Sequence, residues 1–351
     1  MKIIFKRTTP TYRNQLTTQN VMVYLTAALL IVSLFSVGYY FTLGADYGIK
    51  AFLMIAVSLV AAYVTEAGYF YLMKEKDIKK AVNRSFPYVT GILYALILPV
   101  GTPYYVVIVG SVFSIFIGKL IFGGFGQNIF NPALIGRVFV MMSYGDKLTA
   151  DLPGKGVDGL TGATPTTILA GAGWMEKLDI SLPELYLGFY KGSIGETFAL
   201  LIIILGVFLA LKKVLDWRMP VFYMGTCFII AFICGLLKGL SPLEFALIHI
   251  GIGGLVFGGV FMLTDPVTSP VSPYGKILFA VGAGFFTMLL RFKSNMPEGV
   301  LYSILIMNML TPMIDKYTVM PTNKDENRKM AVIAAAVVLS ALIVALMWKG
   351  G

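Results

Sequence analysis

Long apolar runs constrain this fold more than any other feature of the sequence. The 351 residues are 57% hydrophobic and 13% charged, whereas soluble domains have about 25% charged residues. A membrane-spanning helix needs about 20 apolar residues. We therefore expect an all-α, multi-pass membrane protein. The apolar runs lie at 21–43, 49–73, 87–101, 104–122, 129–143, 197–214, 219–237, 243–263, 276–291, 299–314 and 330–348.

Two parts of the chain follow the same plan of a Pro-interrupted helix, a full helix with a basic end, and a helix begun by Pro. The first comprises Leu98–Pro103, Gly110, Lys119 and Asn131-Pro132, and the second comprises Asp265–Pro273, Gly282, Arg291 and Met296-Pro297. The copies are five spans apart and so have opposite orientations, as in transporters with inverted repeats. Chance spacing of Pro and Gly is the alternative. Irregular backbone at membrane depth must be buried or line a cavity, so we expect both Pro-rich stretches to point into one interior site.

Basic residues gather in short loops, which predicts the orientation by the positive-inside rule. This clustering, rather than a basic face, accounts for the net charge of +10, so we expect membrane lipids and no nucleic acid as partners. The first run is too long for a signal-peptide core and is expected to stay as a helix. The predicted divisions are a cytoplasmic segment 1–20, a first five-helix repeat 21–143, an extracytoplasmic loop 144–196, a second five-helix repeat 197–314, a cytoplasmic loop 315–329 and an additional helix 330–351.

The long polar loop contains Asp158-Gly-Leu-Thr-Gly-Ala-Thr164-Pro165. This segment is similar to the Asp-x-x-(Ser/Thr)-Gly-Ala-Thr pattern of proteins that carry flavin mononucleotide (FMN) esterified through its phosphate to the last threonine. The similarity implies Thr164 as the attachment residue, with Asp158, Thr161, Gly162 and Ala163 around it. The alternative is a polar turn with a buried or capping hydroxyl.

Two further segments have residue types that suit a flavin. In Gly123–Ala133, the glycines allow close backbone approach, and Asn128 and Asn131 offer amide donors and acceptors. The segment with Gly192, Ser193 and Glu196 leads into the sixth run, where Ser193 would serve as a cap and the segment would hold the flavin ring or its phosphate. The alternatives are a helix-connecting turn with asparagine caps and a plain loop-to-helix junction.

Together with Thr-Asp265-Pro-Val-Thr-Ser-Pro, these segments resemble the D subunit of the Rnf complex, the ion-translocating ferredoxin:NAD oxidoreductase, over nearly all of residues 20–315. The chain is similar, too, to the B subunit of the sodium-pumping NADH:quinone oxidoreductase, which has a longer N-terminal extension. The resemblance implies a urea-transporter-like fold, covalent FMN at Thr164 and a non-covalent riboflavin lined by Asn128 and Asn131.

The function implied is that of a membrane electron-transfer subunit, which is an enzyme only within its complex. The other subunits would supply iron–sulfur clusters, the NAD site and a second covalent FMN, and a flavin transferase would attach the FMN. This fits a chain with no Gly-x-Gly-x-x-Gly motif between a predicted strand and a helix. It also fits a chain with only two cysteines, Cys227 and Cys234, which we expect to be small core residues. The alternatives are a solute channel of the same architecture and a scaffold without cofactor.

Acids inside membrane spans are costly and mark functional sites. Glu66, Glu244, Asp265 and Asp315 lie in or at the ends of the runs. We expect Asp265 and Glu66 on an ion pathway, with Na⁺ or H⁺ left open. For Asp265, a salt bridge to Lys119 or Lys276, or a helix cap, is the alternative. The single histidine, His249, is expected to be a polar packing residue.

Overall fold

The computed structural model describes residues 16–148, 181–188, 192–294 and 299–318, and all regular structure in these ranges is helical. The elements are α1 (Thr18–Leu43), α2 (Ala45–Leu72), α3 (Ile78–Ser85), α4 (Pro87–Leu96), α5 (Tyr104–Ile115), η1 (Phe116–Leu120), α6 (Pro132–Leu148), α8 (Leu182–Leu187), α9 (Ala199–Leu211), α10 (Arg218–Lys238), α11 (Pro242–Gly251), α12 (Leu255–Phe257), η2 (Gly258–Met262), α13 (Pro273–Lys293) and α14 (Gly299–Thr318).

Every apolar run predicted between residues 21 and 314 contains a helix, whereas the run 330–348 lies outside the described residues. Two short helices were not predicted. The first, α3, is amphipathic and begins where the Asp77 side chain accepts a hydrogen bond from the Lys80 backbone N–H, at 3.1 Å. The second, α8, begins with a capping box formed by Ser181 and Glu184, the arrangement that pairs two free N–H groups of a helix start.

Helix length separates full spans from half spans. Four described helices are long and apolar enough to cross a membrane, namely α1, α2, α10 and α13. Helix α11 and the following segment, made of α12 and η2, meet at an angle of 66° and together would form a fifth, broken span. Helix α4 has 10 residues, which at 1.5 Å per residue reaches about half of a ~30 Å hydrocarbon core. No described helix spans residues 97–103 or 263–272, so the interruptions predicted at Leu98–Pro103 and Asp265–Pro273 are confirmed.

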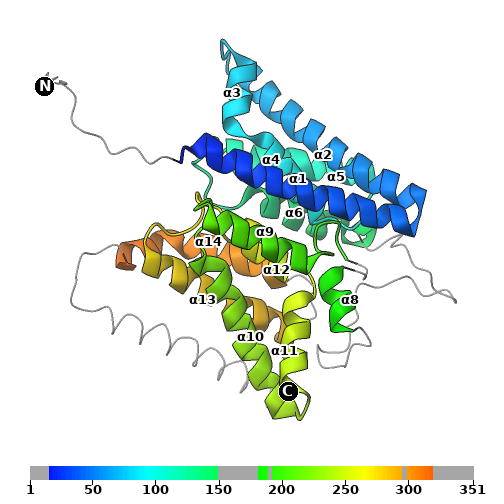
Figure 1. Cartoon of the computed structure of the whole chain (residues 1–351). Helices are drawn as coiled ribbons and strands as arrows, with labels where there is room; N and C mark the ends of the chain where they lie inside the picture. The colour runs from blue at the N-terminus through cyan, green and yellow to red at the C-terminus, as the bar shows by residue number, and fades with distance from the viewer. Residues whose placement is uncertain (1–15, 149–180, 189–191, 295–298, 319–351) are drawn as a thin grey trace, which may run out of the picture.

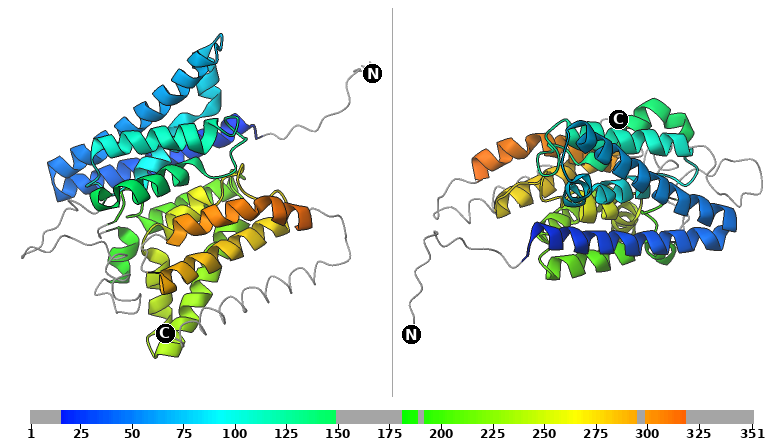
Figure 2. Two further views of the ribbon diagram at one scale, coloured as in Figure 1. Left: turned by 180° about the vertical axis from the view of Figure 1, so that it is seen from behind. Right: turned by 90° about the horizontal axis from the view of Figure 1, so that it is seen from above.

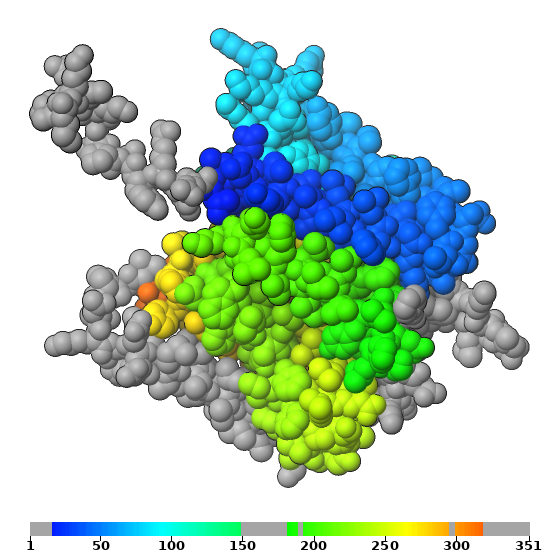
Figure 3. Space-filling model, in the orientation of Figure 1, coloured from blue at the N-terminus to red at the C-terminus, as the bar shows by residue number. Residues whose placement is uncertain are grey.

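The helices form two groups, α1–α6 and α9–α14, which lie side by side in Figures 1 and 2. In the first group, α5 packs between α2 and α6, and α4 packs on α1 and α2; in the second, α10 contacts α11 and α13, and α13 contacts α14. The groups meet where α1 packs on α9, visible as the blue and green surfaces in Figure 3, and where α6 contacts α14. Each group includes one π-helical turn, η1 or η2, a feature that is frequent at functional sites.

The outer faces of α1 and α2 are apolar and exposed, with Leu34 71%, Val64 60% and Leu72 77% exposed. Soluble proteins rarely leave contiguous apolar surface of this kind open to water, whereas lipid covers it without cost. The inward faces form one core that contains both Cys227 and Cys234, so their prediction as core residues is confirmed. The chain is a multi-pass membrane protein.

Candidate functional site

A pocket lies between the two helix groups. It has about 760 Å³ of space not filled by atoms, part of it open to solvent. Its walls come from α1, α4, η1, the Gly-rich stretch, the α9–α10 loop and the segment that follows η2. The walls are mainly apolar, and their polar residues are Ser85, Thr90, Lys119, Asn128, Asn131, Thr264 and Asp265.

The Gly-rich stretch enters the pocket as irregular backbone between η1 and α6. Gly123, Gly124 and Gly126 adopt left-handed conformations, with φ of 111°, 94° and 86°, which residues with a Cβ rarely reach. The stretch carries Phe125, whose ring centroid lies 5.3 Å from that of Phe86 at an interplanar angle of 59°. Both rings line the pocket, so this stretch supplies an aromatic wall beside its amides.

The two asparagines predicted as flavin contacts both line the pocket, but they differ in what else they bind. The Asn131 carboxamide accepts from the Ala133 backbone N–H at 3.1 Å and donates to the Met262 carbonyl at 3.3 Å, which ties the start of α6 to η2. The Asn128 carboxamide donates to the Phe130 carbonyl at 3.0 Å. Its oxygen has no hydrogen bond to any described residue and is the better placed of the two to meet a ligand.

A buried ion pair forms one wall. The Lys119 ammonium lies 3.0 Å from Glu66 Oε1 and 3.1 Å from Oε2, and both side chains are almost fully buried. The Ser85 hydroxyl also donates to Glu66, and the Ser85 carbonyl accepts from Lys119. Lys119 and Ser85 line the pocket, whereas Glu66 is not among its lining residues. Sequence reasoning placed Lys119 at a helix end and Glu66 in mid-span but did not pair them.

Asp265 lies in the opposite wall, and its hydrogen bonds hold the start of the Pro-rich stretch in a turn. Its carboxylate accepts from the Val267 backbone N–H and from the Thr268 hydroxyl, each at 3.2 Å. These contacts close a turn, and no described helix begins after Asp265 until Pro273, so the helix cap given as an alternative for Asp265 is not observed. The salt bridges are not observed either, because Lys119 pairs with Glu66 and Lys276 pairs with Asp216, at 3.1 Å.

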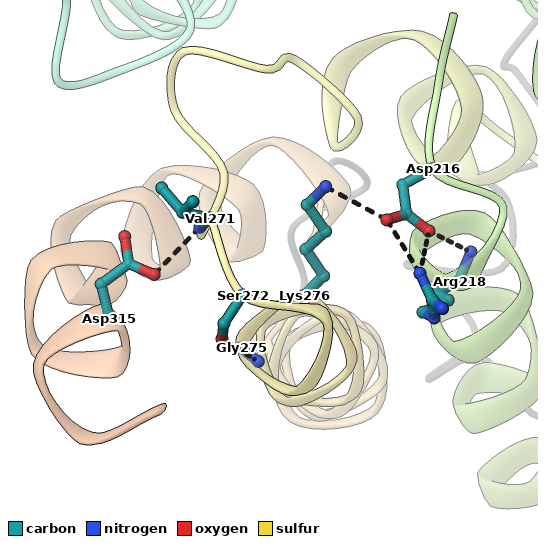
Figure 4. A network of polar contacts seen from close by, with 7 residues as sticks. All are labelled: Asp216, Arg218, Val271, Ser272, Gly275, Lys276 and Asp315. Atoms are coloured by element: carbon teal, nitrogen blue, oxygen red, sulfur yellow. Dashed lines mark hydrogen bonds and ion pairs between the residues drawn. The ribbon is translucent and has the colours of Figure 1, made fainter. Parts of the chain in front are cut away.

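The Pro-rich stretch is held at its far end by the polar contacts drawn in Figure 4. Asp315 accepts from the Val271 backbone N–H at 2.9 Å, and the Ser272 hydroxyl caps α13 at Gly275. Lys276 reaches Asp216 in the α9–α10 loop. Burial raises the pKa of Asp216, but hydrogen bonds and charge from Arg218 and Lys276 outweigh burial and hold that pKa below its usual value. Asp315 and Asp216 thus fix the loop that carries Asp265.

The expectation that both Pro-rich stretches meet in one interior site is wrong for this pocket. Thr264–Val267 line it, but no residue of Leu98–Pro103 does. The first residues of α4 face the pocket, whereas Leu98–Pro103 follows its last residue, about 15 Å away along the helix. At that end of α4, the Gly101 carbonyl accepts a hydrogen bond from the Lys50 ammonium, near the start of α2.

The segment with Gly192, Ser193 and Glu196 lies at the break after α4, where Leu98–Pro103 is found. The Ile194 and Gly195 backbone N–H groups donate to Leu98 and Leu96, at 3.0 and 2.6 Å, and so satisfy backbone carbonyls at the break after α4. The Tyr40 hydroxyl donates to the Gly192 carbonyl at 3.1 Å. The Glu196 carboxylate lies against Gly254, in the break between α11 and α12. This segment therefore joins the two helix breaks, away from Asn128.

Ser193 is not the cap of the sixth predicted span. Helix α9 begins at Ala199, and its N-cap residue, Phe198, makes no side-chain cap. The turn at Ser193 instead closes through its carbonyl, which accepts from the Glu196 N–H at 3.1 Å. Thr197 follows in this junction and is fully buried.

The remaining predicted residues divide between structural roles and the undescribed part of the chain. His249 is buried between the rings of Phe245 and Phe292, as predicted for a packing residue. Glu244 stands in the first turn of α11, where an acid interacts favourably with the helix dipole. The proposed FMN segment, with Asp158, Thr161, Gly162, Ala163 and Thr164, lies outside the described residues.

Comparison with known proteins identifies the family of this chain. Residues 6–324 match the model of the NQR2, RnfD, RnfE family. The chain belongs to this family. It is 40% identical to the D subunit of the proton-translocating ferredoxin:NAD(+) oxidoreductase complex of Clostridium ljungdahlii, over 78% of this chain and 84% of the relative.

Two further relatives show the breadth of the NQR2, RnfD, RnfE family. The chain is 38% identical to the D subunit of the Na(+)-translocating ferredoxin:NAD(+) oxidoreductase complex of Acetobacterium woodii, over 86% of this chain and 87% of the relative. It is 34% identical to the B subunit of the Na(+)-translocating NADH-quinone reductase of Chromohalobacter salexigens, over 84% of this chain and 71% of the relative.

Proposed function

We propose that this chain is the D subunit of an ion-translocating ferredoxin:NAD oxidoreductase complex and that it passes electrons through bound flavins. The observation that carries the proposal is the 38–40% identity to two D subunits over 84–87% of their length. The two cysteines are buried in the core and are too few for a four-thiolate cluster. The clusters would therefore come from the other subunits of the complex, which are its partners. The NAD site is assigned to them as well, because all regular structure in the described ranges is helical and offers no strand–helix dinucleotide motif.

A non-covalent flavin such as riboflavin is proposed at the pocket, on the chemistry of its lining residues. The carboxamide oxygen of Asn128, which no described residue engages, can accept a hydrogen bond from the polar edge of the ring, and Phe86 and Phe125 supply apolar walls. Asn131 positions this wall by holding α6 to η2. When bound, a flavin supplies transfer of one or two electrons, and the protein supplies its binding, orientation and electrostatics.

The covalent FMN is proposed at Thr164, attached by a flavin transferase. In the purified complex, Thr164→Val should abolish the ultraviolet fluorescence of the denatured chain and the FMN mass increment on the peptide that contains residue 164. Thr161→Val is the matched control and should retain both. The assignment is wrong if the increment survives in Thr164→Val or if it disappears only in Thr161→Val.

The proposed architecture is two inverted five-helix repeats. It is supported by the matching order of elements: α1, α2, α3–α4, α5–η1 and α6 against α9, α10, α11–α12–η2, α13 and α14. The basic helix ends also correspond. Lys119 donates to the Ser85 carbonyl at the end of α3, and Arg291 donates to the His249 and Ile252 carbonyls at the end of α11.

With the N-terminus cytoplasmic, the proposed flavin loop 144–196 lies outside the cytoplasm. Lys155→Cys should then react with an impermeant maleimide in intact cells whose outer barrier is permeable. Lys76→Cys, in the basic stretch between α2 and α3, should react only after lysis. The opposite pattern would reverse the topology.

Asp265 and Glu66 are proposed to influence ion translocation. The names of the D-subunit relatives specify protons in one case and Na⁺ in the other, so similarity leaves the ion open. In vesicles with the whole complex, Asp265→Asn should lower ion uptake per electron while ferredoxin-driven NAD reduction partly persists. If both activities fall in strict proportion, Asp265 only holds the Pro-rich stretch in its turn.

A further inference from the structure

The Lys119–Glu66 ion pair is oriented with respect to the pocket. Lys119 and Ser85 line the pocket, whereas Glu66 is not among the lining residues and pairs with Lys119 from α2. The pair is neutral as a whole, but Lys119 lines the pocket and Glu66 does not, so a ligand in the pocket lies on the Lys119 side of the pair. Because both side chains are buried, with 3% and 0% of their surface exposed, water screens this dipole little.

Lys119 is held in this orientation on several sides. Both Glu66 carboxylate oxygens and the Ser85 carbonyl accept hydrogen bonds from its ammonium or lie in ion-pair contact with it. The Phe125 ring centroid lies 5.7 Å from Nζ, on the side of the Gly-rich stretch. A fixed buried charge needs no rearrangement when a neighbouring group changes its charge, which makes its effect on that group large.

We propose that Lys119 is the residue that sets the reduction potential of the flavin in this pocket. An electron added to the ring makes it more negative, and the ammonium stabilises that state relative to the oxidised one, so Lys119 raises the midpoint potential. Electrons enter from and leave to the other carriers of the complex, and Lys119 exchanges neither an electron nor a proton. This inference rests on the proposed function.

Two other charged groups, Glu66 and Asp265, act on the same pocket, and their charges determine the direction in which each variant should shift the midpoint potential. Glu66 lies behind Lys119 and offsets its field. Asp265 lines the opposite wall and opposes Lys119, although its carboxylate is already engaged by the Val267 N–H and the Thr268 hydroxyl. Removing a positive charge should thus lower the midpoint potential, and removing the negative charge of Glu66 should raise it.

The experiment is a spectroelectrochemical titration of the non-covalent flavin in the purified complex, made with the Thr164→Val chain to remove the covalent flavin of this subunit. The covalent flavin of the other subunit is the same in every variant, so differences between variants report on the pocket. Lys119→Met should lower the midpoint potential, Lys119→Arg should keep it near that of the parent, and Glu66→Gln should raise it. Lys50→Met, at the break after α4 where the Lys50 ammonium donates to the Gly101 carbonyl outside the pocket, is the control and should leave the midpoint potential unchanged.

The results separate this inference from the function on which it rests. If acid extraction of the parent complex releases no flavin, the pocket does not hold one and both proposals for it fail. If flavin is released but Lys119→Met leaves the potential unchanged, or Lys119→Arg shifts it as far as Lys119→Met, the role of Lys119 is overturned while the flavin site stands. Equal shifts in one direction for Lys119→Met and Glu66→Gln would also overturn it, because an effect of packing, and not of charge, would then explain both.

Discussion

Replacing Glu66 by Met should destabilise the protein strongly, because it leaves the Lys119 charge buried without its carboxylate. Of its described hydrogen-bond partners, Lys119 would keep only the Ser85 carbonyl, and the Ser85 hydroxyl would lose its acceptor. Breaking a buried ion pair from one side costs about 3–5 kcal/mol. At about 1.4 kcal/mol per factor of ten, the folding equilibrium should fall by roughly two to four powers of ten.

The double variant Glu66→Met/Lys119→Met should recover most of this loss. Two apolar side chains of similar volume avoid the desolvation of both charges, so replacement of a whole buried pair is often neutral or stabilising. The two Ser85 groups that lose partners would limit the recovery by about 1–3 kcal/mol. The double variant should therefore be more stable than either single variant.

The measurement is unfolding by sodium dodecyl sulfate in mixed micelles, followed by circular dichroism, for all four members of the cycle. The expected coupling free energy is several kcal/mol, well above the 0.3–0.5 kcal/mol that distant sites show, roughly, as departure from additivity. Lys276→Met, which breaks a partly exposed pair, should cost only about 0–1 kcal/mol. If the losses of the two single variants simply add in the double variant, the pair does not stabilise the fold as argued.

Three further outcomes follow from single contacts. Asn128→Ala should weaken flavin binding by about 1–3 kcal/mol, or about 5- to 100-fold in Kd, measured as flavin released per chain; unchanged retention would remove Asn128 from the site. Gly195→Ala should cost about 1–3 kcal/mol, because its Cβ would lie 2.7 Å from that of Leu96, whereas Gly225→Ala, with no neighbour within 4 Å, should be tolerated. Since Asp216 has a lowered pKa, its stabilising effect should be full above about pH 4 and be lost as pH falls through the folded-state value; an unaltered acid unfolding curve in Asp216→Asn would contradict this.

Much of the fold could be predicted because helix formation in a membrane is local. In lipid, each backbone N–H and C=O must find a partner within its own segment, so an apolar run of sufficient length becomes a helix wherever it packs. The breaks were also local, since Pro273 cannot continue a preceding helix and begins α13 well. Amphipathic α3 escaped prediction because its eight residues in a basic stretch gave no apolar run.

The pocket could be predicted only in part. The amides of Asn128 and Asn131 were a usable signal. Nothing in the local sequence, however, shows that both the nitrogen and the oxygen of the Asn131 carboxamide bind backbone groups, one of them the carbonyl of Met262, 131 positions away. Phe86 and Phe125 were missed because their rings meet only when α4 and the Gly-rich stretch pack together.

The sequence by itself determined that this chain is helical and spans a membrane several times, because run length and proline position are local properties. Its motifs resemble those of flavin-bearing proteins, and flavin binding stays a prediction. Only the tertiary structure decided which charges pair. Lys119 pairs with Glu66, 53 positions away, and not with Asp265, although Lys119 and Asp265 line the same pocket. A buried charge takes the partner that packing brings within about 3 Å, and the order of residues along the chain does not specify that distance.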